Sequence, residues 1–445
     1  MSKLIRLAVV SLAAFIWFCA EAPEPEATRP PNIVLIISDD QSWTDYSFMG
    51  HEAIQTPHID KLASESMLYT RGYVPTALCR PSLATIMTGL YTHQHGITGN
   101  DPDGESRDPA NRDRMVQVFE RSPTVARLLA EKGYLSHQSG KWWEGSPARG
   151  GFTHGMTHGD VERRGRHGDD GLKIGREGMK PIFDFIAEAG ESPFFVWYAP
   201  FLPHTPHNPP ERLLAKYQAP DRPEPVAKYY AMCEWFDETV GELMLHLDEK
   251  GLRENTVVLY VQDNGWIQTA DPREWHTGRA KVSPYEAGAR TPIMLRWPGK
   301  VEPGRDDRTL ASSIDLAPTI LRAAGVEPPE EMPGIDLTRR ELLHERKHLF
   351  GELFAHTAVE VEQPEANLKY RSVVREDGWK LVWPYRANDE VTLMIRGQTA
   401  DWMRDEAELF NVRDDPHETK DLAAENLEIV TELKSQINGW WNLGG

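Results

Sequence analysis

TALCRPSLATIMTGL, residues 76–90, contains a single cysteine, Cys79, which is followed at once by Arg80, Pro81 and Ser82. A proline has the φ angle of a first helical turn, and a serine there can bond to free N–H groups, so the stretch predicts a short helix. Cys79 would then lie at the helix N-terminus, where backbone N–H groups and the helix dipole favour negative charge. A buried structural cysteine beside an ordinary helix is the alternative for these residues alone.

Oxygen-bearing side chains follow two apolar runs of the chain. Residues 32–38 (NIVLIIS) and 256–261 (TVVLYV) are continuous and β-branched, which is typical of strands buried on both faces of a parallel sheet. The side chains at their ends are Asp39, Asp40, Asp263 and Asn264. Open α/β sheets bind ligands at the carboxyl ends of their strands, and such oxygens suit Ca²⁺ or Mg²⁺. We therefore expect these residues to converge on one divalent cation beside Cys79, although Asp39 and Asp40 by themselves would indicate only a solvated acidic loop.

Residues 134–139 are expected to form a short strand and the apolar residues 194–199 a buried one, and each strand leads into a basic residue. Lys141 follows the first in the sequence GKWW, and His204 follows the second in PHTPH, where two prolines restrict the backbone. A surface lysine after a strand is the ordinary interpretation of Lys141 by itself.

Residues 145–178 are rich in glycine, histidine and arginine, and we expect a long irregular loop, which in a compact domain often serves a function. Its basic cluster consists of Arg163, Arg164, Arg166 and His167. In a chain whose formal charge is −19, this cluster is the best local attractor for an anionic substrate. A flexible loop balanced by neighbouring acidic residues is an equal alternative.

Together these motifs resemble the type I sulfatases, in which a cysteine in a Cys-x-Pro-Ser-Arg context is oxidised to formylglycine. The matching residues of the first motif are Cys79, Pro81, Ser82, Thr88 and Gly89. Residues 278–298 resemble the family segment Lys-x-x-x-Tyr-Glu-Gly-Gly through Lys281, Tyr285 and Glu286. The motifs follow the family order over nearly all of the chain, which is far more specific than any one of them.

Two positions depart from the family pattern, because Leu83 replaces its arginine and Trp143 replaces its histidine. The planar guanidinium of Arg80 could reach back as an anion clamp, and His167 could supply the missing base. Our hypothesis is an active variant with a relocated arginine.

The resemblance implies a sulfuric ester hydrolase that acts on a sulfated organic substrate, most simply a carbohydrate. Formylglycine made from Cys79 by a maturation enzyme would be the nucleophile, next to a Ca²⁺ or alternatively Mg²⁺ ion. Lys141 and Lys281 would stabilise developing negative charge, and His204 would be the general acid for the leaving alcohol. His207 would contact the substrate.

Two other functions remain open. One is a phosphodiester or phosphonate hydrolase of the same superfamily. The other is a catalytically inactive homologue that binds sulfated glycans, which the changes at Leu83 and Trp143 favour. A purely structural exported protein would not explain why acidic pairs and lysines recur at strand ends.

The resemblance also implies the fold, an alkaline-phosphatase-like α/β sandwich whose large, mostly parallel sheet is flanked by helices. We expect this catalytic domain over residues 32–346. A subdomain with a small antiparallel sheet and a terminal helix would follow over residues 347–445, with strands at 349–354, 370–375 and 379–383. Residues 100–115 are expected to be a surface loop, and residues 228–250 a long helix.

Composition and the N-terminus indicate an exported protein. Residues 1–20 have the basic start and short apolar run of a signal peptide, and residues 21–31 form a tether rich in proline and glutamate. A periplasmic or secreted location follows, with lipid anchoring through Cys19 as an alternative and no membrane-spanning segment after cleavage. The acidic net charge excludes a nucleic-acid surface, and three cysteines cannot form a disulfide framework.

Overall fold

The computed structural model describes residues 29–102, 109–160, 163, 165–271, 278–385, 394–395, 398–399 and 403–443. The expected signal peptide, Cys19 and most of the expected tether lie outside these residues, as does Arg164. No described helix combines the length and the apolar character needed to cross a membrane.

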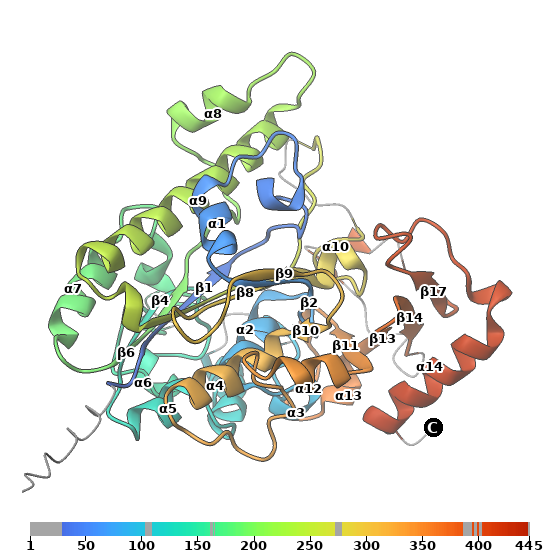
Figure 1. Ribbon diagram of the computed structural model, residues 1–445. Coiled ribbons are helices and arrows are strands. Elements are labelled where there is room, and N and C mark those ends of the chain that lie inside the picture. The colour runs from blue at the N-terminus through green and yellow to red at the C-terminus, as the bar shows by residue number, and fades with distance from the viewer. Residues whose placement is uncertain are drawn as a thin grey trace, which may run out of the picture.

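A large sheet forms the centre of the protein (Figure 1). Its described strands lie in the order β10-β2-β8-β7-β1-β6-β4-β5, and β9 pairs with β2. Only β8 is antiparallel to its neighbours β2 and β7, so this described sheet is mostly parallel. The strands are β1 (Asn32–Ser38), β2 (Met67–Tyr73), β4 (Leu135–Gly140), β5 (His154–Gly155), β6 (Phe194–Ala199), β7 (Thr256–Gln262), β8 (Arg290–Arg296), β9 (Gly304–Asp306) and β10 (Ala311–Ser312).

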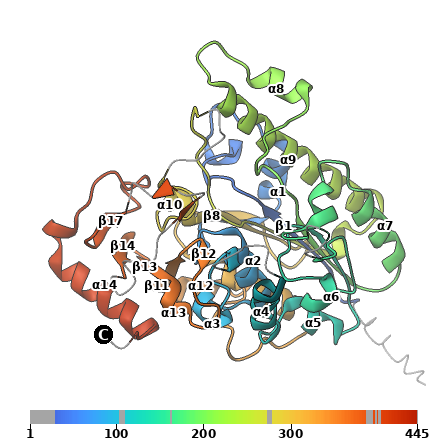
Figure 2. The same cartoon turned by 180° about the vertical axis from the view of Figure 1, so that it is seen from behind.

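Helices cover both faces of this sheet because side chains alternate along each buried strand. In β1, Ile33 and Leu35 belong to one apolar core, while Val34 and Ile36 belong to a second core on the opposite face. Figures 1 and 2 show α1 and α9 on one side and α2, α4 and α5 on the other. The helices that contribute to these cores include α1 (Pro57–Ser64), α2 (Cys79–Thr88), α4 (Pro109–Glu120), α5 (Val125–Ala130), α7 (Lys180–Ala189), α9 (Glu224–Glu249) and α11 (Leu316–Ala323).

Shorter elements connect these layers. Beside the main sheet, β3 (Asp101–Pro102) pairs in parallel with β12 (Thr357–Ala358). The remaining short helices are α3 (Thr92–His95), α6 (Pro147–Gly150), α8 (Glu211–Tyr217), α10 (Glu286–Ala289), α12 (Arg340–Glu345) and α13 (Pro364–Asn367). Within the expected irregular segment 145–178, the described residues form only α6, β5 and a 3₁₀ turn at Asp169–Lys173.

The expectation of a surface loop over residues 100–115 is wrong for its second half. Helix α4 begins at Pro109, a residue suited to the first turn of a helix. Its polar first half hides the signal, because the apolar positions Met115, Val118 and Phe119 that pack into the core come only after it.

The C-terminal part forms a second, four-stranded antiparallel sheet, in the order β11-β13-β14-β17. Its strands are β11 (His348–Phe354), β13 (Leu368–Arg375), β14 (Trp379–Pro384) and β17 (Glu408–Asn411). Helix α14 (Leu427–Trp440) packs Leu433 and Ile437 on this sheet, and Figure 1 shows α14 in red at one side of the protein, beside the orange to red strands. The expected fold class is confirmed.

Candidate active site

The in-register pairing of β1 with β7 brings the predicted oxygen ligands together. Ser38 pairs with Gln262, and the Asp263 N–H donates to the Ser38 carbonyl at 2.9 Å. Asp40 then adopts a left-handed conformation with φ of 60°, and its N–H donates to Asp263 Oδ1 at 3.2 Å. Two consecutive residues of a strand point to opposite faces, so this break lets both Asp39 and Asp40 face the same site.

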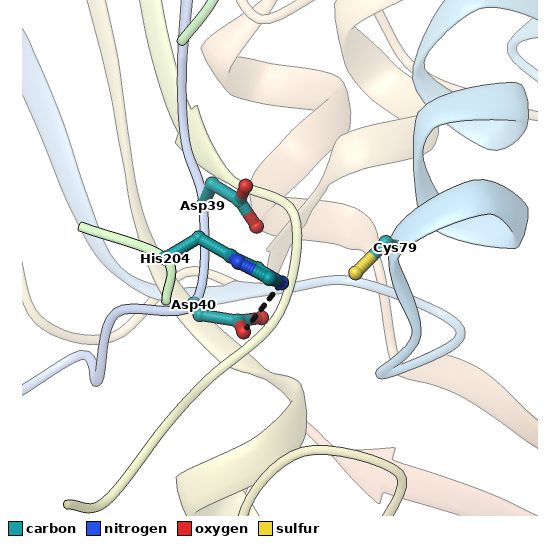
Figure 3. Close-up of side chains that lie close together, drawn as sticks. All are labelled: Asp39, Asp40, Cys79 and His204. Atoms are coloured by element: carbon teal, nitrogen blue, oxygen red, sulfur yellow. Dashed lines mark ion pairs between the residues drawn. The ribbon is translucent and has the colours of Figure 1, made fainter. Parts of the chain in front are cut away.

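Figure 3 shows Cys79 and His204 beside this acidic pair. One ligand-capable atom from each of Asp39, Asp40, Cys79 and His204 lies within 4.8 Å of all the others. Cys79 is the first residue of α2, and its sulfur points from the helix toward the carboxylates. The helix does not use Ser82 as a cap, because the Ser82 hydroxyl has no hydrogen-bond partner among the described residues.

Four buried oxygen atoms at this site lack a hydrogen-bond partner within the described part of the chain. They are Asp39 Oδ2, Asp40 Oδ2, Asp263 Oδ2 and Asn264 Oδ1. A buried polar atom without a partner is costly, and a group of carboxylate and amide oxygens is the ligand type that Ca²⁺ and Mg²⁺ prefer. The donor set therefore fits a hard divalent cation, and His204 belongs to the same group, which the sequence did not indicate.

Two buried lysines contact the other carboxylate oxygens. Lys141 Nζ lies 2.5 Å from Asp39 Oδ1, and Lys281 Nζ lies 2.6 Å from Asp40 Oδ1. Burial lowers the pKa of each lysine, but the neighbouring carboxylates raise it further, so both groups stay protonated. Burial likewise raises the pKa of Asp40, yet Lys281 and His204 outweigh it and the net pKa is lowered.

The backbone before Lys141 admits only glycine. Gly140 ends β4 with φ of +89°, and a Cβ at that position would lie 1.8 Å from the Ala199 carbonyl oxygen. Because glycine has no Cβ, β4 can approach β6 closely there, and Lys141 is delivered from the strand end directly to Asp39.

The Cys79 side chain is a poor nucleophile as a thiol. Burial raises the pKa of the Cys79 thiol to about 11, although the nearby Lys141 and Lys281 oppose this. At neutral pH the residue is therefore protonated, whereas the thiolate is the reactive form. Leu83 packs in the same apolar core as Cys79, so no charged group replaces the family arginine at that position.

His204 is held in one orientation. Its Nδ1 lies 2.6 Å from the Thr205 carbonyl oxygen, an acceptor, which places the proton on Nδ1. Nε2 is then the nitrogen that faces Asp40, 3.4 Å from Oδ2, and the ring stacks on Phe201 with centroids 4.1 Å apart. Burial lowers the pKa of His204 well below its usual range.

Trp143 and His167 form one wall beside Lys141. Their ring centroids are 5.4 Å apart, and Lys141 Nζ lies 5.3 Å from the Trp143 ring. Burial, with Arg166 and Lys141 nearby, lowers the pKa of His167 to about 3, which leaves it neutral but weakly basic at pH 7. Its role as the missing base stays a prediction.

The Arg80 guanidinium already forms an ion pair with Glu144. Its Nε and one terminal nitrogen each donate to Glu144 at 2.7 Å, and both side chains are buried. The second terminal nitrogen lies 3.4 Å from the Asn100 carbonyl oxygen. The guanidinium would have to leave Glu144 to clamp an anion, so this role also stays a prediction.

The other predicted substrate-binding residues are spread out. Arg163 is exposed. Arg166 donates to the Asp101 carboxylate through Nε and one terminal nitrogen. His207 is buried against Tyr229, with ring centroids 5.5 Å apart. Arg164 lies outside the described residues, and its placement is therefore left as an expectation.

Sequence reasoning missed three side chains around the site. Glu144 neutralises Arg80, and Phe201 stacks on His204. Arg176 donates to the carbonyl oxygen of His204 at 2.7 Å. Glu144 and Phe201 adjoin recognised motifs and could have been examined, but nothing in the spacing around Arg176 indicates its role.

Two family models match the chain. The Sulfatase model matches residues 31–326, and the model described as N-sulphoglucosamine sulphohydrolase, C-terminal, matches residues 275–441. The first alone spans more than half of the 445 residues.

Curated relatives carry sulfatase names at moderate identity. N-acetylgalactosamine-6-sulfatase of Canis lupus familiaris is 28% identical over 70% of this chain, and the match spans 66% of the relative, just under two thirds of its length. The ulvan-active sulfatase of Formosa agariphila is 26% identical over 94% of this chain and 76% of its own length. Among solved structures, Ps i-CgsB in complex with k-i-k-neocarrahexaose has a TM-score of 0.71 at 22% identity and 93% coverage of both chains, which supports the fold. By its match to the Sulfatase model, the chain belongs to the sulfatase family.

Proposed function

We propose that this protein is a sulfuric ester hydrolase that removes sulfate from a sulfated carbohydrate. The observation that carries the proposal is a group of buried oxygens without hydrogen-bond partners, next to one cysteine and two lysines. The residues are Asp39, Asp40, Asp263, Asn264, Cys79, Lys141 and Lys281. This group combines a cation site, a residue that can become a nucleophile, and fixed positive charge, in a chain of the sulfatase family.

The cation and the modified cysteine would have distinct places in this site. Asp39, Asp40, Asp263 and Asn264 would hold Ca²⁺, or alternatively Mg²⁺, through their unpartnered oxygens. When present, formylglycine at position 79 supplies a hydroxyl nucleophile, and the cation supplies a Lewis acid beside it.

The chain's own side chains would carry charge and proton transfer. The ammonium groups of Lys141 and Lys281 are fixed by their carboxylate partners and would stabilise the negative charge of the sulfo group during transfer. At rest His204 carries its proton on Nδ1, so Nε2 would first take up a proton from solvent and then give it to the oxygen of the leaving alcohol as the S–O bond breaks. The fourth oxygen of the released sulfate would be that of the attacking hydroxyl, and water would replace this hydroxyl before the next turnover.

A carbohydrate substrate agrees with the names of the relatives, which include an N-acetylgalactosamine-6-sulfatase and an ulvan-active sulfatase. Arg166 and His167 lie on the segment that packs against Trp143, and we propose that they border the bound glycan. Arg166 is partly exposed, and its guanidinium pairs with the buried Asp101.

The proposed reaction can be tested by direct product analysis. Protein produced together with a formylglycine-generating enzyme is expected to release inorganic sulfate from sulfated oligosaccharides. Ion chromatography would measure the sulfate, and mass spectrometry of the peptide containing Cys79 would measure its modification. Faster cleavage of an aryl phosphodiester than of any sulfate ester would favour the phosphodiesterase alternative. An unmodified thiol together with glycan binding and no turnover would favour an inactive binding protein.

Calcium is expected to raise the melting temperature of the protein. Ligand at 100 times its Kd stabilises by about 2.7 kcal/mol, which for a chain of this size corresponds to a shift of roughly 2–5 °C. Asp263→Asn should remove most of this shift, because it takes one carboxylate from the oxygen group. The matched control is Asp184→Asn, an exposed residue that pairs with Lys180. Equal calcium-induced shifts of the melting temperature in the two variants would contradict a cation site that includes Asp263. A parallel Mg²⁺ titration would show which of the two ions stabilises the protein more.

A further inference from the structure

Arg176 makes an unusual set of contacts with the loop that carries His204. Its Nε donates to the Phe201 carbonyl at 2.8 Å, and one terminal nitrogen donates to the His204 carbonyl at 2.7 Å. The other terminal nitrogen donates to Asn208 Oδ1 at 2.5 Å and lies 3.3 Å from the Pro206 carbonyl. One side chain thus bonds to residues at both ends and in the middle of the loop.

This loop has little hydrogen bonding of its own. Its sequence from residue 201 to 208 is FLPHTPHN, in which two prolines cannot donate. Described backbone contacts tie it to the sheet near its start, where the Asp39 N–H donates to the Leu202 carbonyl at 3.0 Å and Asp39 forms a parallel β-bridge with Pro203. Among the described residues, Arg176 supplies the donors to the carbonyl groups of Phe201, His204 and Pro206.

The same guanidinium also supports the aromatic ring beneath the imidazole. Its central carbon lies 5.4 Å from the Phe201 ring centroid, and Phe201 stacks on His204 at 4.1 Å. Arg176 thus restrains His204 twice, through the backbone and through the ring on which the imidazole rests. The planar fork of arginine suits several fixed acceptors, and an ammonium group could reach fewer of them.

Side-chain packing does not explain why position 176 holds a charged residue. Arg176 is partly buried and makes no ion pair with a carboxylate of the described residues, and burial lowers its pKa to about 10. A desolvated cation without a direct counter-ion costs stability. An apolar side chain against Phe201 and Trp235 would avoid that cost but would leave the loop carbonyls without donors.

We infer that Arg176 is a positioning residue, which holds His204 so that Nε2 faces the leaving-group oxygen of the substrate. The inference rests on the proposed function, in which His204 is the general acid. A displacement of about 1 Å at a reacting group can cost on the order of 10²-fold in rate. Loss of Arg176 should therefore resemble loss of His204, although neither its guanidinium nor its contacts involve the reacting atoms.

Leaving-group dependence separates this role from a general structural one. A sugar alcohol needs a proton as it leaves, whereas 4-nitrophenolate leaves without one. Arg176→Met is expected to lower kcat about 10- to 10²-fold on a sulfated sugar but less than about 3-fold on 4-nitrophenyl sulfate. The kcat of Arg176→Lys on the sulfated sugar should lie between those of the wild type and Arg176→Met. In a His204→Ala background, adding Arg176→Met should change kcat less than about 2-fold, because the positioned group is gone.

The matched control is Arg222→Met, since Arg222 also donates to a carbonyl, that of Tyr217, and lies over an aromatic ring, that of Tyr230. Arg222→Met should leave kcat unchanged on both the sulfated sugar and 4-nitrophenyl sulfate. Equal losses on the two sulfate esters, or additive losses with His204→Ala, would show that Arg176 only supports the fold.

A measurement without substrate keeps this inference distinct from the proposed reaction. Nitrogen-15 spectra of histidine-labelled protein, with His204 assigned from His204→Ala, should show the Nδ1-protonated tautomer in the wild type. Arg176→Met should lose that signature through averaging. An unchanged His204 signal would overturn the inference whether or not the protein turns over sulfate esters, whereas a wild type inactive on both esters would count against the proposed function alone.

Discussion

Cys79→Ala is expected to abolish detectable turnover of sulfate esters, with a loss of kcat on the order of 10⁴- to 10⁶-fold, as for removal of other enzyme nucleophiles. Alanine leaves no atom at the helix N-terminus that can take the sulfo group. Cation binding should survive, since the unpartnered oxygens belong to other residues. The measurement is single-turnover and steady-state sulfate release on the same preparation, together with the calcium shift of the melting temperature.

The chain offers a matched control for this cysteine. Cys233 is also fully buried and unpaired, but it lies in α9 beside Ile54 and Trp266, in a separate apolar cluster. Cys233→Ala should cost some stability through the cavity it leaves while kcat stays within about 2-fold. Full activity of Cys79→Ala, or equal loss in both variants, would contradict a nucleophile at position 79.

Much of the site could be predicted because its residues adjoin strongly patterned segments. The run 32–38 is apolar at every position but the first and last, so its assignment as a central strand was secure, and Asp39 and Asp40 had to lie at its carboxyl end. The same holds for Asp263 after β7, whereas β4 has the largely polar sequence LSHQSG and Lys141 was singled out through its family motif. Parallel neighbours end at the same edge of a sheet, so their proximity followed from the fold.

What escaped prediction depends on contacts between distant parts of the chain. The pairing of Arg80 with Glu144 spans 64 residues, and nothing in either motif specifies it. The left-handed conformation of Asp40 is set by its hydrogen bond to Asp263, 223 residues away. Arg176 stands alone in a glycine-rich segment, and its acceptors are backbone carbonyls, which carry no sequence signal.

The junction with the C-terminal part holds a second buried charge group that the sequence did not indicate. Lys380 of β14 lies 2.9 Å from Glu286 and 3.0 Å from Glu418, and the Glu286 N–H donates to Glu418 at 2.6 Å. These three side chains are at most 2% exposed. Glu286 follows Lys281 on the same segment, so this group joins the small sheet to the segment that delivers a lysine to Asp40. We propose residue 347 as the start of a subdomain that is bound tightly through this contact.

Lys380→Met is expected to lower the free energy of unfolding by about 3–5 kcal/mol, because it leaves two carboxylates buried without their shared ammonium. The exposed control Lys347→Met, which breaks a surface pair with Glu376, should cost less than about 1 kcal/mol. Burial already raises the pKa of Glu418 to about 7. A carboxyl whose pKa is higher in the folded than in the unfolded protein loses stability as pH rises through that value, and removal of Lys380 raises the folded pKa further. Urea unfolding should therefore show a larger deficit at pH 8 than at pH 6, and Glu418→Gln added to Lys380→Met should recover part of it. A deficit below 1 kcal/mol, or one that grows as pH falls, would mean that the ammonium of Lys380 does not hold this junction.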